Sequence, residues 1–335
     1  MCSSDLLSFL LNAMTDWRLS IFGLITLFVV YYLQDGIVGF VRATLNLQSY
    51  AQSDAETTRA TAHAEKALQH QTAATAEDIL VASGVLMQFG GLKALNNVDL
   101  RIRRGTIHGL IGPNGSGKST MMNVLTGIYV PTAGSIAFED RSLVKRTSSE
   151  IALSGIARTF QNVQLFGEMT AMQNVLVGLH HTYASNLLDV ALHTPRYRRE
   201  RDQSASRAHA LLQFVGLSDL AGEEARNLPY GKQRLLEIAR ALALNPQLLL
   251  LDEPAAGLTA PDIKELVSII QKIRGEGITV ILIEHHMDVV MSICDTVTVL
   301  DFGQKIAEGT PSVVQTDPKV VEAYLGGDAA ALAAA

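Results

Sequence analysis

The sequence predicts an α/β fold with a mixed sheet core, an antiparallel β subdomain and a helical subdomain, preceded by an apolar helix, and three observations carry the prediction of the core. The glycine-rich stretch Gly112–Thr120 (GPNGSGKST) joins a short apolar run to a segment that can begin a helix. Two later runs, 247–251 and 278–283, are almost wholly apolar, which is typical of parallel strands covered on both faces. Both of these runs end in acidic or imidazole side chains, at the sheet edge where open α/β sheets hold their ligands.

The composition allows one large domain with an appendage, or two modest domains. The chain has 335 residues, of which 48% are hydrophobic, so it can bury a substantial core. Its net charge of −6 and pI near 5.8 argue against a dedicated nucleic-acid binder, and we expect no nucleic-acid partner. Cys2 and Cys294 lie at opposite ends of the sequence, which predicts neither a disulfide framework nor a metal site.

The first 48 residues form an apolar segment. Leu19–Leu33 (LSIFGLITLFVVYYL) is uncharged, a little shorter than the ~20 residues of a typical spanning helix, and we predict that it crosses a membrane. A signal peptide and an interfacial or buried helix are the alternatives. Residues 49–78 contain neither Gly nor Pro and are rich in Ala, Thr and Gln, which predicts a partly helical linker.

The main domain is predicted to span residues 79–327. It opens with β-type runs at 79–87 and 94–102, which are separated by the Gly90-Gly91 turn. A strand over 106–111, a helix over 118–126 and a strand over 135–138 follow in that order. Phe89, just before that turn, either stacks on a nucleobase or is a packing residue.

The next part of the chain is predicted to be mostly helical from 161 to 227, within a helical subdomain of about 162–240. The charged run 196–202 reads as a solvated helical face, with partner docking as the alternative. A helix begins after Pro229-Tyr230-Gly231 and buries a stripe that includes Leu235 and Ile238.

The last part combines a helix from Pro261 to before Gly275, a strand over 296–300, and two short helices that start at Thr310-Pro311 and Asp317-Pro318. The Ala-rich residues 328–335 are expected to fray.

The chemistry of a polyphosphate site explains the polar residues at the sheet edge. Glycines at 112, 115 and 117 allow successive backbone N–H groups to face an anion, while Lys118 reaches the outer phosphates and Ser119 offers a ligand to Mg²⁺. Two carboxylates after a buried strand would be unfavourable without such a use. Asp252 is therefore predicted to hold the metal ion, and Glu253 to orient or deprotonate the attacking water.

In their order, these motifs resemble those of the ATP-binding subunits of ABC transporters, over residues 79–326. The resemblance implies ATP and Mg²⁺ as cofactors. It implies catalytic roles for Glu253, the switch histidine His285, the Q-loop Gln161 and Lys118, and metal ligation by Ser119, Gln161 and Asp252. It assigns nucleotide contacts to Phe89, Gly112, Pro113, Asn114, Gly115, Ser116, Gly117, Lys118, Ser119, Thr120, Tyr230 and Gly231.

Within this family, the sequence is most similar to the ATPases of branched-chain amino acid importers. The segments that carry this similarity are RTFQNVQLF, LPYGKQRLLEIARAL, LLLLDEPAAGL, ILIEHHMDVV and VVEAYLG. The resemblance implies two permease subunits, a solute-binding protein, a second ATPase subunit that is a paralogue or another copy, and a place at the cytoplasmic face of the inner membrane. Residues 16–42 resemble the last membrane helix of such a permease, which would anchor the chain. A urea or amide importer, a soluble ABC ATPase and a scaffold that no longer hydrolyses ATP are the alternatives.

The chain departs from the family pattern in two loops, the D-loop (256–259) and the turn at the switch histidine, and in the signature motif, which the resemblance places at Leu228–Gln233. Pro229 stands where a serine is common, Tyr230 where many members have glycine, and Lys232 where glutamine is common. Thr259 replaces the D-loop aspartate, and His286 replaces the aspartate after the switch histidine. We therefore expect the two ATP sites of a dimer to be unequal.

Overall fold

The computed structural model describes residues 77–325. The apolar segment and linker predicted within residues 1–76, and the tail predicted from 328, lie outside the described residues. Within 77–325, none of the helices has the length and apolar character needed to cross a bilayer.

A mixed six-stranded sheet forms the centre of the fold, in the order β10-β9-β3-β8-β7-β6. Neighbouring strands are parallel except for the edge pair of β9 and β10, which is antiparallel. The strands are β3 (Ile107–Ile111), β6 (Ile156–Arg158), β7 (Leu248–Asp252), β8 (Thr279–Ile283), β9 (Thr296–Asp301) and β10 (Gln304–Gly309). The predicted parallel core is confirmed, whereas β6 is too short and β10 too polar to be recognised from their sequences.

The neighbouring strands β7 and β8 are buried on both faces, as their uninterrupted apolar sequences predict. In β7, Leu248 and Leu250 join one hydrophobic cluster, whereas Leu249 and Leu251 join the other. This alternation follows from the two-residue period of a strand. The sheet is therefore the middle layer between two separate apolar cores.

An antiparallel four-stranded sheet covers one of these faces, in the order β2-β1-β4-β5. Its strands are β1 (Asp78–Phe89), β2 (Leu92–Arg103), β4 (Ala133–Phe138) and β5 (Arg141–Ser142). The Gly90-Gly91 turn between the first two strands is confirmed, and the strands extend one or two residues beyond the predicted runs.

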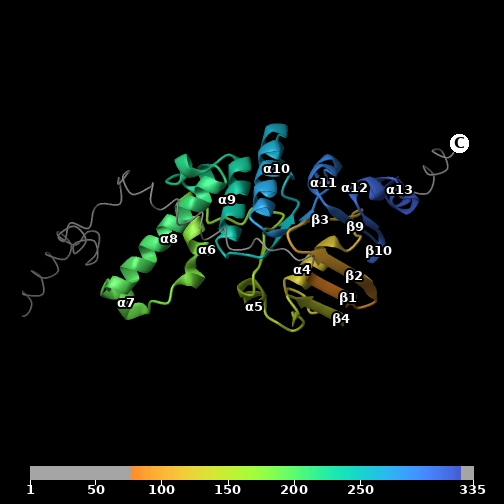
Figure 1. Ribbon diagram of the computed structural model, residues 1–335, viewed down its shortest axis with the longest axis horizontal. Helices are drawn as coiled ribbons and strands as arrows, with labels where there is room; N and C mark the ends of the chain where they lie inside the picture. The colour runs from red at the N-terminus through yellow and green to blue at the C-terminus, as the bar shows by residue number, and fades with distance from the viewer. Residues whose placement is uncertain (1–76, 326–335) are drawn as a thin grey trace, which may run out of the picture. The chain divides into compact units, whose positions relative to one another are not determined.

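Helices dominate the chain between β6 and β7, and α6, α8 and α9 pack against one another (Figure 1). Non-helical loops interrupt the predicted helical stretch, and the charged run lies on α8, as expected. These helices are α6 (Ala171–Gly178), α7 (Leu187–Ala191), α8 (Pro195–Phe214) and α9 (Tyr230–Leu242).

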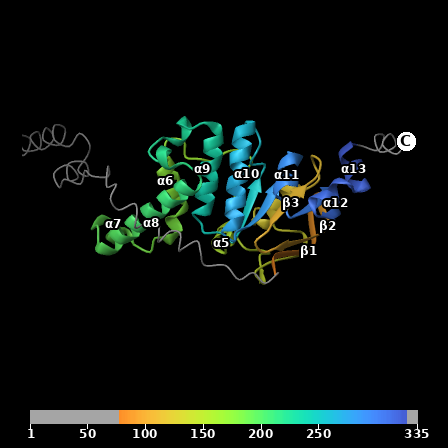
Figure 2. The same ribbon diagram turned by 45° about the horizontal axis from the view of Figure 1, so that its top comes forward.

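The remaining helices flank the six-stranded sheet. The helix α10 packs against β8, α11 lies beside β3 (Figures 1 and 2), and the short terminal helices pack near β10. The bounds are α4 (Lys118–Leu125), α5 (Ser148–Leu153), α10 (Ala260–Gly275), α11 (Met287–Ile293), α12 (Pro311–Gln315) and α13 (Pro318–Leu325).

Candidate functional site: a phosphate loop and the strand ends beside it

The loop between β3 and α4 requires glycine at its two ends. Gly112 has φ of 150°, and a Cβ there would lie 2.0 Å from the carbonyl oxygen of Leu300. Gly117 has φ of 104°, and its Cβ would lie 2.6 Å from the carbonyl oxygen of Ala94. No side chain fits at either position, so the loop can pass close to β9 and β2 only with these glycines.

Lys118 spans this loop from the first turn of α4. Its Nζ donates hydrogen bonds of 2.7 Å to the Gly112 carbonyl and 3.0 Å to the Pro113 carbonyl. Burial lowers the pKa of this lysine, and the nearby carboxylates of Glu253 and Asp252 oppose that shift. An anionic phosphate at the loop would supply stronger acceptors than two neutral carbonyls.

The loop's other polar groups fit a phosphate. Ser116 Oγ is buried and has no hydrogen-bond partner in the structure. The helix α4 starts without a side-chain cap at Gly117, so its first N–H groups are not satisfied by a side chain. A Cβ at Gly115 would have no neighbour within 4 Å, and Asn114 and Ser119 are exposed. An anion could therefore approach main-chain donors and an unpaired hydroxyl in the same loop.

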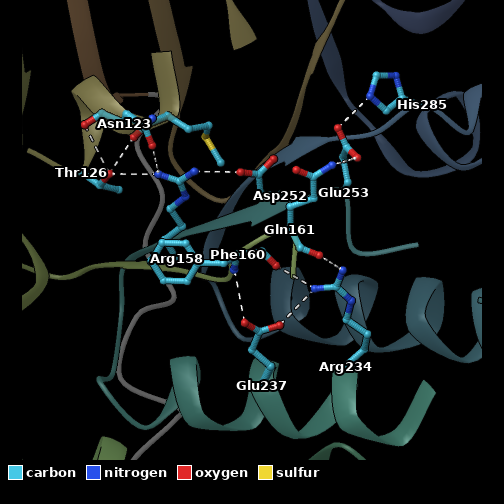
Figure 3. A network of polar contacts seen from close by, with 11 residues as sticks. Asn123, Thr126, Arg158, Phe160, Gln161, Arg234, Glu237, Asp252, Glu253 and His285 are labelled. Carbon is cyan, nitrogen blue, oxygen red and sulfur yellow. Dashed lines mark hydrogen bonds and ion pairs between the residues drawn. The ribbon is translucent and has the colours of Figure 1, made fainter. Parts of the chain in front are cut away.

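Asp252 ends β7 and is held by Arg158, which ends the neighbouring parallel strand β6. Arg158 Nη2 donates to Asp252 Oδ2 at 2.8 Å, and both side chains are more than nine-tenths buried. The other terminal nitrogen of Arg158 donates to Asn123 Oδ1 at 2.7 Å, which ties the carboxylate to α4 (Figure 3). The predicted metal ligand is therefore fixed relative to the helix that follows the phosphate loop.

Glu253 lies between two of the predicted site residues. Its Oε2 accepts a 2.9 Å hydrogen bond from Gln161 Nε2, and its Oε1 lies 2.7 Å from His285 Nε2 (Figure 3). The backbone of Glu253 has φ of 48°, a left-handed conformation that is uncommon for a residue with a side chain and is often associated with functional sites. Three residues that are distant in the sequence are thus brought together at one sheet edge.

Glu284, the residue before His285, holds the neighbouring loops in place. Its buried carboxylate accepts from the backbone N–H groups of Ala255 at 2.6 Å, His285 at 3.1 Å and His286 at 3.4 Å. One side chain therefore fixes both the start of the loop after Glu253 and the turn that carries His285.

The predicted signature turn begins α9. Pro229 occupies the N-cap position and gives no side-chain cap, consistent with the loss of the common hydroxyl. Tyr230 is half-exposed, while Gly231 is buried where a Cβ would lie 2.8 Å from Asp262 Cγ. Thr259 accepts from the Asp262 N–H and completes a capping box at the start of α10, which gives this departure from the family pattern a local structural role.

Phe89 lies at the end of β1, with 42% of its surface exposed. Its ring and that of Tyr129 form a T-shaped contact at a centroid distance of 5.2 Å. The ring is therefore held by a neighbouring aromatic residue and still partly exposed, as a base-stacking residue requires.

Four charged residues around the site were not predicted from the sequence: Arg158, Arg234, Glu237 and Glu284. A signal exists for two of them. Arg234 lies one turn from Ile238 on the same buried face of α9, and Glu237 lies three residues after Arg234. Charged residues in an apolar helical stripe need buried polar partners, and these partners become visible only in the fold.

The fold and this site define a phosphate-loop nucleoside triphosphatase. A model of the ABC transporter family matches residues 95–256, and a model described as branched-chain amino acid ATP-binding cassette transporter matches residues 304–330. The ADP conformation of MJ1267, an ATP-binding cassette of an ABC transporter, matches with a TM-score of 0.66 and 35% identity, over 75% of this chain and 99% of that chain.

Relatives with curated names agree with these matches. The high-affinity branched-chain amino acid transport ATP-binding protein LivG of Salmonella typhimurium is 45% identical over 251 residues, which are 75% of this chain and 98% of that protein. BraF of Pseudomonas aeruginosa, with the same description, is 44% identical over 249 residues, which are 74% of this chain and 98% of that protein. The chain therefore belongs to the family of ABC transporter ATP-binding subunits, whose activity is ATP hydrolysis.

Proposed function

We propose that this chain is the ATP-hydrolysing subunit of an ABC importer for branched-chain, hydrophobic amino acids. The observation that carries the proposed hydrolysis is the position of Glu253 between Gln161 and His285, beside the phosphate loop of Lys118. The solute class is supported by the names of the similar proteins and by the match at 304–330.

In this proposal the phosphate loop binds ATP through its residues 112–120. Lys118 exchanges its two carbonyl partners for β- and γ-phosphate oxygens, and the loop N–H groups bind the same phosphates. Ser119, Asp252 and Gln161 offer the oxygen ligands that Mg²⁺ prefers. When bound, Mg²⁺ would neutralise charge on the β- and γ-phosphates. Phe89 stacks on the adenine.

Hydrolysis then depends on the residues at the strand ends. Glu253 accepts a proton from water as the water oxygen attacks the γ-phosphorus, and the bond from that phosphorus to the β–γ bridging oxygen breaks to release ADP. His285 orients the γ-phosphate, and Gln161 keeps Glu253 aimed at the water. The chain's own Arg158 holds Asp252 in position throughout.

A second ATPase subunit completes the active unit in this proposal. Tyr230 and Gly231 close the ATP site of that subunit, which is a paralogue or another copy of this chain. Two permease subunits and a solute-binding protein complete the importer, at the cytoplasmic face of the inner membrane. We retain the division into a segment 1–48, a linker 49–78, an ATPase domain 79–327 with a helical subdomain of about 162–240, and a tail 328–335 as part of the proposal.

Residues 19–33 are proposed, from their sequence, to anchor the chain in the membrane as a permease-like segment. An alkaline carbonate wash tests this directly, because it removes peripheral proteins and leaves inserted ones. Retention of the full chain, together with release of a variant lacking residues 1–48, is the expected result. Release of the intact chain would contradict the anchor without affecting the proposed hydrolysis.

The proposed function is tested with the assembled transporter in vesicles. ATP-dependent uptake of leucine, isoleucine and valine is expected, with phosphate release that these solutes stimulate. Complexes carrying Glu253→Gln provide the matched control, because they retain the binding loop. Uptake of urea but not of the three amino acids would show that the importer carries urea and not branched-chain amino acids. A wild-type complex without phosphate release would overturn the proposed activity.

A further inference from the structure

We propose that Arg234 and Glu237, two buried residues of α9, are positioning residues that couple the signature turn to the main chain at Gln161 and thereby link the two ATP sites of the assembled dimer. This inference rests on the proposed function, because it assumes that the turn at Tyr230 closes the partner's ATP site. The predicted motifs assign no role to either residue.

The two side chains hold the main chain just before and at Gln161. Glu237 Oε1 accepts from the Phe160 N–H at 3.3 Å, and Arg234 Nη1 donates to the Phe160 carbonyl at 2.7 Å. Arg234 Nη2 also donates to the Gln161 carbonyl. Figure 3 shows all three bonds reaching this segment from a single helix.

The hydrogen bonds to the neighbouring strand end just before Phe160. The last described bond between this segment and β7 joins the Thr159 N–H to the Leu250 carbonyl at 2.9 Å, and β6 itself ends at Arg158. Phe160 and Gln161 therefore take their position from α9, not from the strand ladder. A movement of α9 would move the Gln161 backbone with it.

A contribution to stability does not by itself explain this buried ion pair. Arg234 and Glu237 form an ion pair of 3.1 Å with side chains only 2% exposed. Desolvating two charges costs several kcal/mol, and apolar residues of similar volume often give equal or greater stability. The specific gain in this position is the set of three directed bonds to a main chain that carries a site residue.

The same guanidinium contacts the signature turn. The Tyr230 ring centroid lies 5.7 Å from Arg234 Cζ, within the range of a cation–π contact. The Tyr230 ring also lies against the loop after Glu253, since a Cβ at Gly257 would be 3.4 Å from its Cε1 atom. Arg234 is therefore positioned between the turn expected to meet the partner's ATP and the backbone of Gln161.

Contacts continue from Gln161 to the proposed reaction centre. Its side-chain amide donates to Glu253, which in turn contacts His285. If the partner's nucleotide displaced Tyr230, Arg234 and the backbone of Gln161 would move with it. The orientation of the Glu253 carboxylate would then change. We infer that the coupling is positive, so that ATP bound at one site strengthens ATP binding at the other; because couplings of binding free energies are reciprocal, the effect is the same in both directions.

The test uses the assembled transporter with Arg234→Lys, which keeps the charge but cannot make the forked pair of bonds. We expect turnover per complex to fall about tenfold, because small misplacements of catalytic groups reduce rates strongly. The Hill coefficient for ATP binding should fall from above 1 in the wild-type complex to 1 in the variant. Arg240→Lys is the matched control, since Arg240 lies on α9 over the Phe166 ring and makes no described bond to Phe160 or Gln161. It should change neither quantity.

Glu237→Gln is a second variant for the case in which Arg234→Lys does not fold, as judged by thermal melting. It retains an acceptor for the Phe160 N–H while removing the ion pair, and should also lower the Hill coefficient to 1. A wild-type Hill coefficient of 1, or an unchanged coefficient in a folded Arg234→Lys or Glu237→Gln complex, would overturn the coupling. A wild-type complex without phosphate release would instead overturn the proposed function, and the coupling with it.

Discussion

The strand ends and the signature turn contribute to the candidate site in different ways. Asp252 ends β7, and Glu253 and Glu284 come directly after β7 and β8, which are parallel strands buried on both faces. Sheet hydrogen bonds hold the backbone of Asp252 and of Glu253, whose N–H donates to the Ile283 carbonyl. Tyr230 and Gly231 begin a helix, and their link to the rest of the site passes through side chains such as Arg234. The strand ends thus present a rigid set of groups, whereas the signature turn depends on a few directed contacts.

This difference indicates where substitutions should act. At the strand ends, a change of functional group should affect chemistry and leave the fold intact, because the sheet holds the backbone. At the signature turn and the loop before α10, small changes of capping or contact should alter stability or coupling more than chemistry. Four measurements sharpen or break this contrast.

The largest effect is expected for Glu253→Gln. Turnover should fall by about 10³-fold, because an amide cannot accept the proton from water, and proton transfer by a positioned side chain contributes ~10²–10⁴. ATP affinity should persist because Lys118 and the loop are unaltered. Phosphate release and retained nucleotide measure the two quantities. Glu322→Gln, which changes an exposed carboxylate of α13, is the control. Near-normal hydrolysis by the Glu253→Gln complex would exclude the role of Glu253.

Lys118→Ala should weaken ATP binding at least ~100-fold. The variant loses the charged partner of the phosphates, and hydrogen bonds to charged groups contribute ~1.5–3 kcal/mol each. Equilibrium titration with a fluorescent ATP analogue measures this loss. Lys264→Ala removes an exposed lysine of α10 and should leave affinity unchanged. Equal affinities for the two variants would mean that the loop does not bind the phosphates through Lys118.

The sheet itself should show a pH dependence through His108 of β3. Burial lowers the pKa of His108 to about 4, outweighing the opposing effect of Glu308, and its Nε2 lies 2.9 Å from Thr298 Oγ1. Between pH 4 and 6.5 the unfolded chain binds more protons at this residue, so stability rises with pH across that window. The loss between pH 7.5 and 4 should reach about 3 kcal/mol.

His108→Gln is the variant that tests this dependence, because its amide can still bond Thr298 but does not titrate. The free energy of unfolding, measured in urea from pH 4 to 7.5, should vary less in the variant than in the wild type. Parallel curves for the two proteins would show that His108 contributes nothing to the acid sensitivity of the sheet.

The smallest effect is expected for Thr259, which replaces the D-loop aspartate of the family. Thr259→Ala should lower the free energy of unfolding by about 1 kcal/mol, because the capping box with Asp262 is lost. Thr259→Asp should retain stability, since aspartate also caps helices well. Thr170→Ala removes the equivalent capping box of α6 and provides the comparison. An unchanged free energy of unfolding in the Thr259→Ala variant would show that this cap does not stabilise the start of α10.

The sequence alone predicted the parallel sheet, which the structure confirms, and the residues that we propose for the phosphate site. Uninterrupted apolar runs predict strands buried on both faces, and the glycine pattern from Gly112 to Gly117 predicts a phosphate-binding loop. The strand ends were predictable for the same reason, because Asp252, Glu253 and His285 directly follow such runs. These features depend on local sequence, and the fold changes little about them.

Only the tertiary structure decided which residues hold the site together. Arg158 binds Asp252 across 94 positions of sequence, and Arg234 binds the main chain at Phe160 across 74. No local pattern encodes these partners, because each bond forms when strands and helices from separate parts of the chain pack side by side. The sequence thus names the groups that would meet ATP, while the packing of α9 on the loop after β6 sets how they are aligned.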